Sequence, residues 1–242
     1  MKRLTPRPEA ITQAELDFFR REGYVRLHGL HNKAALGSLR AKILAELSRL
    51  KIWSKGKNAG SALGSLPAFQ QIARLSSMVK IPDLDAALST PEVHHAIVEL
   101  AGRTPRGGQG SQLLLSLPHQ GRESSANLNW HVDIAAPSAG EIPGIQAFYL
   151  IDDVVPRGGA TLALARSHRL PDDAARRLRG SLKTPADPEE ILRTHGTEIV
   201  EMSGRAGDVF LMDMRVLHSP SVNLSSHIRM MATTRFDLRA AG

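Results

Sequence analysis

Cysteine is absent from the 242-residue sequence, aromatic residues are few, and no long apolar run occurs. The absence of cysteine excludes disulfide bonds, thiolate metal ligands and cysteine nucleophiles, so nitrogen and oxygen atoms must bind any transition metal. No stretch approaches the roughly 18 apolar residues that a membrane-spanning helix needs. Residues 1–8 carry charge without an apolar run behind them, which argues against a secretory signal. We therefore expect a cytoplasmic protein that is not bound to a membrane.

The formal net charge of +7 admits a nucleic acid or an acidic small molecule as partner, although a generally arginine-rich proteome explains it equally well. The ten aromatic residues do not interleave with the densest basic group, so a stacking platform for single strands is poorly supported. That group consists of Arg166, Arg169, Arg176, Arg177, Arg179 and Lys183. We expect no nucleic-acid partner, whereas an acidic substrate remains open.

Helical patterns dominate the first 105 residues. Thr12 with Glu15 forms a capping box, Asn32 is typical of a second N-cap, and Thr90 precedes a proline at the first helical position. A short alternating segment over 24–27 predicts a strand between the first two helices. Residues 55–65, rich in glycine, serine and alanine, predict a loop.

From about residue 111 the pattern changes to short β-branched and aliphatic runs, which predict a sandwich or barrel. A charged, alanine-rich insertion over 171–194 is expected to be helical and, with the loop over 55–65, to cover the mouth of such a barrel. The predicted strands span residues 113–117, 128–132, 145–151, 160–164, 198–202, 208–212 and 230–236.

Three residues point to metal chemistry. His131 and Asp133 form a His-x-Asp motif near the end of a predicted strand, where alternation would place both side chains on one face. Together with His218 they make the two-histidine, one-carboxylate set that suits non-haem Fe(II) and leaves positions open for other ligands. His-x-Asp alone is weak evidence, since a chain with this composition contains it by chance roughly half the time.

Arg229 lies eleven residues after His218, in the segment that predicts the last strand. Neighbouring strands of a small barrel would bring its guanidinium beneath the metal, where it can bind a carboxylate through two parallel hydrogen bonds. A surface arginine on an edge strand is the competing interpretation.

Several ordered segments resemble the phytanoyl-CoA dioxygenase family of Fe(II)/2-oxoglutarate oxygenases, and the resemblance runs nearly from end to end. The segment Trp130-His131-Val132-Asp133 is similar to the Trp-His-x-Asp metal motif of that family. The other matching segments are residues 11–30, the aromatic strand with its acidic pair at 148–153, the stretch 158–168 ending in Ser167-His168, residues 206–209, and His218 followed by Arg229.

The resemblance implies a double-stranded β-helix, a jelly-roll barrel that is mainly β, with the helical N-terminal part packed on its outer face. We expect a single domain over 1–242, in which residues 1–105 are mainly helical support and 106–242 form the core with its insertion at 171–194. A monomer or a homodimer is expected.

The resemblance also implies a ligand set. His131, Asp133 and His218 would bind Fe(II), and Arg229 would bind the far carboxylate of 2-oxoglutarate. Ser219 or Ser221 would add a hydroxyl to that carboxylate, although Pro220 stands where the family has serine. Phe148 would pack against the co-substrate. The family's Asn-Gly and Pro-Gly dipeptides are here Gly158-Gly159 and Ala165-Arg166, changes that fall in loops.

The function implied is hydroxylation of an aliphatic carbon of a small molecule, an amino-acid derivative or natural-product intermediate, with release of succinate and CO₂. Asp133 favours hydroxylation over halogenation, because halogenating relatives lack this carboxylate. Desaturation, cyclisation and epimerisation at the same iron site are the alternatives, followed by a nucleic-acid oxygenase or a non-catalytic ligand sensor. Among candidate substrate residues we name Gln112, Asn127 and Asn129, on or near the first barrel strands.

Overall fold

Helices occupy the N-terminal part of the chain and strands the C-terminal part, as the sequence predicts. The computed structural model describes residues 11–54, 56–58, 62–106, 110–119, 128–135, 141–183 and 188–239. The α-helices are α1 (Gln13–Glu22), α2 (Lys33–Arg49), α3 (Ala68–Met78), α4 (Leu84–Leu88), α5 (Pro91–Ala101), α6 (Asp172–Ser181) and α7 (Pro188–Thr194), with 3₁₀ turns η1 (Ala62–Ser65) and η3 (Ser167–Arg169). The strands are β1 (Tyr24–Leu27), β2 (Trp53–Ser54), β3 (Lys57–Asn58), β4 (Gln112–Ser116), β5 (Gly144–Leu150), β6 (Thr161–Ala165), β7 (Glu198–Glu201), β8 (Val209–Asp213), β9 (His218–Pro220) and β10 (Arg229–Asp237).

Local capping signals fix the helix ends where the sequence places them. Thr12 Oγ1 accepts the Glu15 backbone N–H while the Glu15 carboxylate accepts the Thr12 N–H, which completes the capping box of α1. Asn32 caps α2 by accepting the Ala34 N–H at 2.8 Å. Gly23 ends α1 and Gly102 ends α5 in the left-handed region, at φ 84° and 69°.

Two antiparallel sheets face each other and make the double-stranded β-helix. The larger sheet has the order β1-β8-β5-β10-β4 and the smaller β7-β6-β9. Alternation along the large sheet sends Phe148, Leu150, Phe210, Met212 and Met231 into one buried cluster with Ala163 of the small sheet. This cluster fills the space between the two sheets, so the predicted fold is confirmed.

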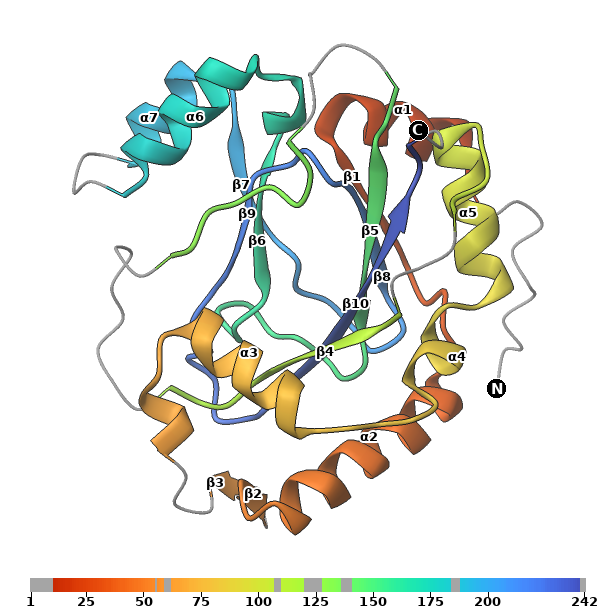
Figure 1. Ribbon diagram of the computed structural model, residues 1–242, viewed down its shortest axis with the longest axis vertical. Helices are drawn as coiled ribbons and strands as arrows, with labels where there is room; N and C mark the ends of the chain where they lie inside the picture. The colour runs from red at the N-terminus through yellow and green to blue at the C-terminus, as the bar shows by residue number, and fades with distance from the viewer. Residues whose placement is uncertain are drawn as a thin grey trace.

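The opposite face of the large sheet is covered by the N-terminal helices. Ile145, Ala147, Tyr149, Leu211 and Phe236 share a second buried cluster with apolar residues of α1, α2, α3 and α5. Figure 1 shows α5, α4 and α2 along one side of the large sheet and α6 and α7 beside the small sheet. The helical part therefore supports the barrel from outside, as expected, and no described helix is long and apolar enough to cross a membrane.

The strand predicted over 128–132 is wrong. Within that range the structure has a single β-bridge, between His131 and His218. Pairing stops there because the Asp133 and Ile134 backbone N–H groups both donate to the Met214 carbonyl, at 3.1 and 3.2 Å, which bends the chain away from a ladder. The insertion, by contrast, is helical as predicted and forms α6 and α7.

Candidate metal centre

The bridge between His131 and His218 brings the two imidazoles together. Each backbone N–H donates to the carbonyl of the other residue at 2.9 Å, and the ring centroids lie 4.2 Å apart. His218 begins β9, whose pairing with β6 sets it opposite Ala163 on the inner side of the small sheet. Two residues distant in sequence are thus placed side by side by main-chain hydrogen bonds.

Backbone carbonyls orient both rings. Nδ1 of His131 lies 2.8 Å from the Asn129 carbonyl, and Nδ1 of His218 lies 3.0 Å from the Val216 carbonyl. Since a carbonyl only accepts, each Nδ1 donates its hydrogen to the backbone, which leaves Nε2 as the ring atom that can bind a metal. Burial, reinforced by the neighbouring His131, lowers the pKa of His218 to about 4, so this ring is neutral and ready to bind at physiological pH.

Asp133 completes the set through the bend rather than through strand alternation. Its Oδ2 lies 3.9 Å from His218 Nε2 and is buried without a hydrogen-bond partner. One ligand atom from each of His131, Asp133 and His218 falls within 4.8 Å of the others. Two free imidazole nitrogens and an unpartnered carboxylate oxygen at this spacing fit a divalent transition metal, and the donor types suit non-haem iron.

Arg229 is buried at the start of β10, with 3% of its surface exposed. Its Nη1 donates to the Gly159 carbonyl, while Nε and Nη2 have no hydrogen-bond partner. Burial lowers the pKa of Arg229 to about 9, and no described carboxylate lies within ion-pair distance to offset that burial. A buried guanidinium with two unsatisfied nitrogens requires an anionic partner, which the carboxylate of a bound molecule would supply.

The other predicted co-substrate residues differ in their freedom to bind. Phe148 is buried on the inner face of β5 and meets His218 edge-on, with centroids 6.1 Å apart. Ser219 donates to the Pro220 carbonyl, and Ser221 donates to the Ala160 carbonyl at 2.6 Å. Both hydroxyl protons are therefore engaged by the backbone in this structure, and neither serine offers a free donor to a carboxylate.

The candidate substrate residues are spread more widely than the ligands. Gln112 is exposed at the beginning of β4, opposite Thr233 of β10. Asn129 is exposed, and its carbonyl, rather than its side chain, contacts His131. Asn127 lies outside the described residues. None of these substrate assignments is tested by the geometry.

The insertion supports the metal motif directly, which sequence reasoning missed. Leu178 of α6 and Leu192 of α7 pack in one buried cluster with Trp130 and Leu217, the residues that immediately precede the two histidines. Because both histidine positions depend on their neighbours' packing, α6 and α7 brace the centre from the side of the small sheet. The tryptophan of the Trp-His-x-Asp motif, 3% exposed, thus serves in the core.

The Ser167-His168 motif holds the backbone near the metal centre in place. Ser167 Oγ accepts the Leu217 backbone N–H at 2.9 Å, one residue before His218. His168 lies against Gly23, where a Cβ atom would come within 2.4 Å of its ring, and its Nε2 lies 3.3 Å from the Arg20 carbonyl. The motif therefore ties the end of α1 to the chain entering β9.

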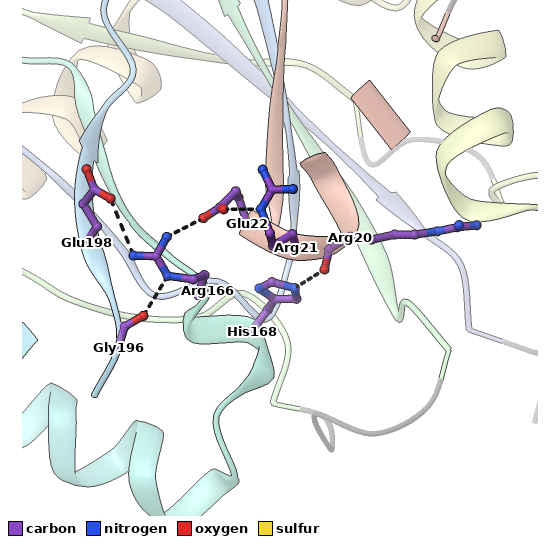
Figure 2. Close-up of polar contacts among 7 residues, drawn as sticks. All are labelled: Arg20, Arg21, Glu22, Arg166, His168, Gly196 and Glu198. Carbon is purple, nitrogen blue, oxygen red and sulfur yellow. Dashed lines mark hydrogen bonds and ion pairs between the residues drawn. The ribbon is translucent and has the colours of Figure 1, made fainter. Parts of the chain in front are cut away.

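Arg166 stands where the resembled family has glycine and adopts the left-handed conformation, at φ 69°. Figure 2 shows its guanidinium between three segments: it binds the Glu22 carboxylate at 2.7 Å, the Gly196 carbonyl at 2.7 Å and Glu198 at 3.5 Å. These contacts offset the roughly 1 kcal/mol that a non-glycine residue pays in this region. They also link α1 to the chain following α7.

Two cavities of about 460 Å³ lie near opposite ends of β10. One is lined by Asp133, Met214, Arg235 and Arg239. The other is lined by Arg229 together with Arg40, Asp152 and Trp53. The first borders the triad and the second borders the buried guanidinium, and Gly56, from the segment 55–65, is among the residues that line the second.

A double-stranded β-helix that gathers two histidines and one carboxylate defines the class of non-haem iron oxygenase sites. The sequence model of the phytanoyl-CoA dioxygenase (PhyH) family matches residues 19–231, and the chain belongs to that family. The predicted family is thereby confirmed, and the protein is an enzyme of this class. A search of curated proteins found no match.

Solved structures show the same fold at low sequence identity. SnoK, a non-haem alpha-ketoglutarate-dependent carbocyclase from nogalamycin biosynthesis, superposes with a TM-score of 0.65 at 18% identity, covering 96% of this chain and 87% of SnoK. EctD from S. alaskensis with bound Fe gives 0.57 at 21% identity, over 97% of this chain and 79% of EctD. The epimerase SnoN in complex with Fe³⁺, alpha-ketoglutarate and nogalamycin RO gives 0.56 at 19% identity, over 93% and 82%.

Proposed function

We propose that this protein is an Fe(II)- and 2-oxoglutarate-dependent dioxygenase that hydroxylates an aliphatic carbon of a small molecule and releases succinate and CO₂. The observation that carries the proposal is the convergence of His131, Asp133 and His218, whose ligand atoms lie within 4.8 Å of one another. Family membership and the bound Fe and alpha-ketoglutarate of the SnoN structure support the same cofactors here.

Each residue of the site would have a distinct binding role. His131 and His218 present Nε2 to the metal, because their Nδ1–H groups are held by carbonyls, and Asp133 presents Oδ2. Arg229 binds the distal carboxylate of 2-oxoglutarate with the nitrogens that have no protein partner. Phe148 would form an apolar wall beside His218.

Iron(II) with 2-oxoglutarate and O₂ supplies the oxidising chemistry. The protein itself holds the ligand side chains in place and excludes water from the site. The buried cluster between the sheets, which includes Phe148 and Phe210, keeps bulk water from the inner face of the barrel. His131, a neutral His218 and the Asp133 carboxylate, held at one oxygen by Arg235, would hold the metal, and this two-histidine, one-carboxylate set would leave room for the co-substrates.

The substrate is proposed to reach the centre through the cavity lined by Asp133, Arg235 and Arg239. A cavity of about 460 Å³ suits a small molecule, such as an amino-acid derivative or natural-product intermediate.

Cyclisation or epimerisation is the second candidate, favoured by the likeness to SnoK, a carbocyclase, and SnoN, an epimerase. Desaturation belongs to the same group. Product mass separates the reactions, since hydroxylation adds an oxygen atom, cyclisation and desaturation remove two hydrogens, and epimerisation leaves the mass unchanged.

The decisive experiment is anaerobic addition of Fe(II) and 2-oxoglutarate to the metal-free protein, read by the visible charge-transfer band of an iron–2-oxo-acid chelate. Wild type is expected to show the band, and His131→Ala is expected to lose it. Addition of O₂ with a panel of small acids, read by succinate release, would then identify the substrate. Bound iron without a band would refute the co-substrate assignment, and no iron binding would favour a non-catalytic sensor.

A further inference from the structure

A second arginine lies on the same face of β10 as Arg229. Arg235 is six residues further along the strand, so alternation points both side chains toward the small sheet. Its backbone is opposite Gln146 of β5. Its Nη2 lies 3.0 Å from Oδ1 of Asp133, an ion pair between the last strand and the bend that carries the metal motif.

The two oxygens of Asp133 therefore have different surroundings. Oδ1 is held by Arg235, whereas Oδ2 is buried, has no hydrogen-bond partner and lies on the side of His218. We propose that Arg235 is a positioning residue for Asp133: it holds Oδ1 so that the carboxylate binds the metal through Oδ2 alone. This inference rests on the proposed function.

One-oxygen binding matters for this class of centre. A carboxylate that rotates to bind through both oxygens would occupy one more position on the metal, and that position is needed by a co-substrate. The Asp133 side chain is 8% exposed and the Arg235 side chain 34%, so the pair is partly buried and screened less than a fully exposed ion pair. Outer partners of ligating carboxylates orient them in this way in metal sites generally.

Arg239, the other arginine that lines the cavity, pairs with Asp237 and not with Asp133. It contacts both oxygens of Asp237, with Nε at 3.0 Å from Oδ1. The cations within ion-pair range of Asp133 among the described residues are Arg235 and, when protonated, His218. Arg239 is thus a matched control, since it has the same charge and lines the same cavity without touching Asp133.

The test compares the metal-free full-length wild type with Arg235→Met, Arg235→Lys and Arg239→Met. Anaerobic titration with Fe(II), and separately with Co(II), gives dissociation constants without any turnover. Arg235→Met is expected to bind about 10–100-fold more weakly. Arg235→Lys, which keeps the charge and one donor, is expected to recover most of that loss, and Arg239→Met is expected to stay within about threefold of wild type.

The Co(II) absorption spectrum supplies the second readout. Freeing Oδ1 raises the number of ligand atoms, so Arg235→Met is expected to shift and weaken the visible Co(II) bands, whereas Arg239→Met is expected to retain the wild-type spectrum. Circular dichroism checks that each variant is folded, and Arg235→Gln, which also removes the charge but keeps a polar side chain, replaces Arg235→Met if that variant is not. Wild-type affinity and an unchanged spectrum in folded Arg235→Met or Arg235→Gln would overturn the inference. Failure of wild type itself to bind metal would instead overturn the proposed function.

Discussion

The inner face of the barrel carries Arg229 at one end and the triad of His131, Asp133 and His218 at the other, and different elements hold the two ends in place. Arg229 sits in a nine-residue strand and is held by a backbone ladder, since β10 pairs with β4 on one side and β5 on the other. The triad rests on one bridge, a bend and the three-residue strand β9, which pairs with β6, and side-chain packing from α6 and α7 adds further support. The proposed co-substrate end is therefore fixed by a long strand with two partners, whereas the metal end relies in part on an insertion.

The largest effect is expected where the insertion meets the metal motif. Leu178→Ala removes a fully buried side chain from the cluster beneath Trp130 and Leu217 and should lower the free energy of unfolding by about 2–5 kcal/mol. Urea unfolding measures this loss. The matched control is Leu47→Ala in α2, which is equally buried in the other core cluster. Both substitutions should destabilise the protein, but only Leu178→Ala should weaken Co(II) binding by the folded protein. Equal Co(II) affinity in the two variants would show that the metal end does not depend on the insertion.

The next effect concerns the co-substrate end. Arg229→Met removes the charged partner of the proposed carboxylate, at a cost of about 1.5–3 kcal/mol in 2-oxoglutarate binding. Metal affinity should remain near wild type, because Arg229 is held by a different element from the triad. Titration of the iron-loaded protein with 2-oxoglutarate gives the first quantity, and Co(II) titration gives the second. A variant that loses metal as well would show that the two ends are coupled.

A smaller effect is expected from Ser167→Ala. The change leaves the buried Leu217 N–H without its acceptor, which costs about 1–3 kcal/mol of stability. Because Leu217 precedes His218, metal affinity should also fall by a few-fold, while 2-oxoglutarate binding to the remaining metal-loaded protein should not change. Ser221→Ala, which alters a hydrogen bond to Ala160 near the other end, serves as the comparison for the metal measurement.

The smallest effect is expected at the exposed Arg40–Asp152 pair, in the cavity that borders Arg229. Arg40 pairs with Asp152 in the cavity that borders Arg229, but the two side chains are 47% and 32% exposed. Arg40→Gln should change stability by less than about 1 kcal/mol, since exposed ion pairs contribute little. The 2-oxoglutarate requirement should stay at the wild-type level. A marked increase would mean that this cavity takes part in co-substrate binding.

Sequence reasoning recovered what local patterns and ordered motifs encode. The capping residues Thr12 and Asn32, the insertion over 171–194 and the strand starting near Arg229 all follow from short-range chemistry and are confirmed. The convergence of His131, Asp133 and His218 was also predicted, although the reason differed, because a bend replaces the expected strand.

What was missed depends on contacts between distant segments. The helices over 68–78 and 84–88 were not anticipated, since α4 is short and α3 has no capping side chain at its start. The pairing of Arg235 with Asp133 and the packing of Leu178 beneath Trp130 arise only when strands and insertion are assembled. No periodicity within either segment carries this information.

The two unsatisfied nitrogens of the buried Arg229 guanidinium have a consequence for the lifetime of the protein. Under the proposed function, 2-oxoglutarate binds the folded chain and not the unfolded one, so it lowers the population of open states by mass action. A ligand at 100 times its dissociation constant contributes about 2.7 kcal/mol. Proteases that cleave transiently opened chains follow this population, so degradation should slow as the 2-oxoglutarate concentration rises and accelerate when 2-oxoglutarate is scarce. Abundance of the enzyme would then follow the supply of its own co-substrate.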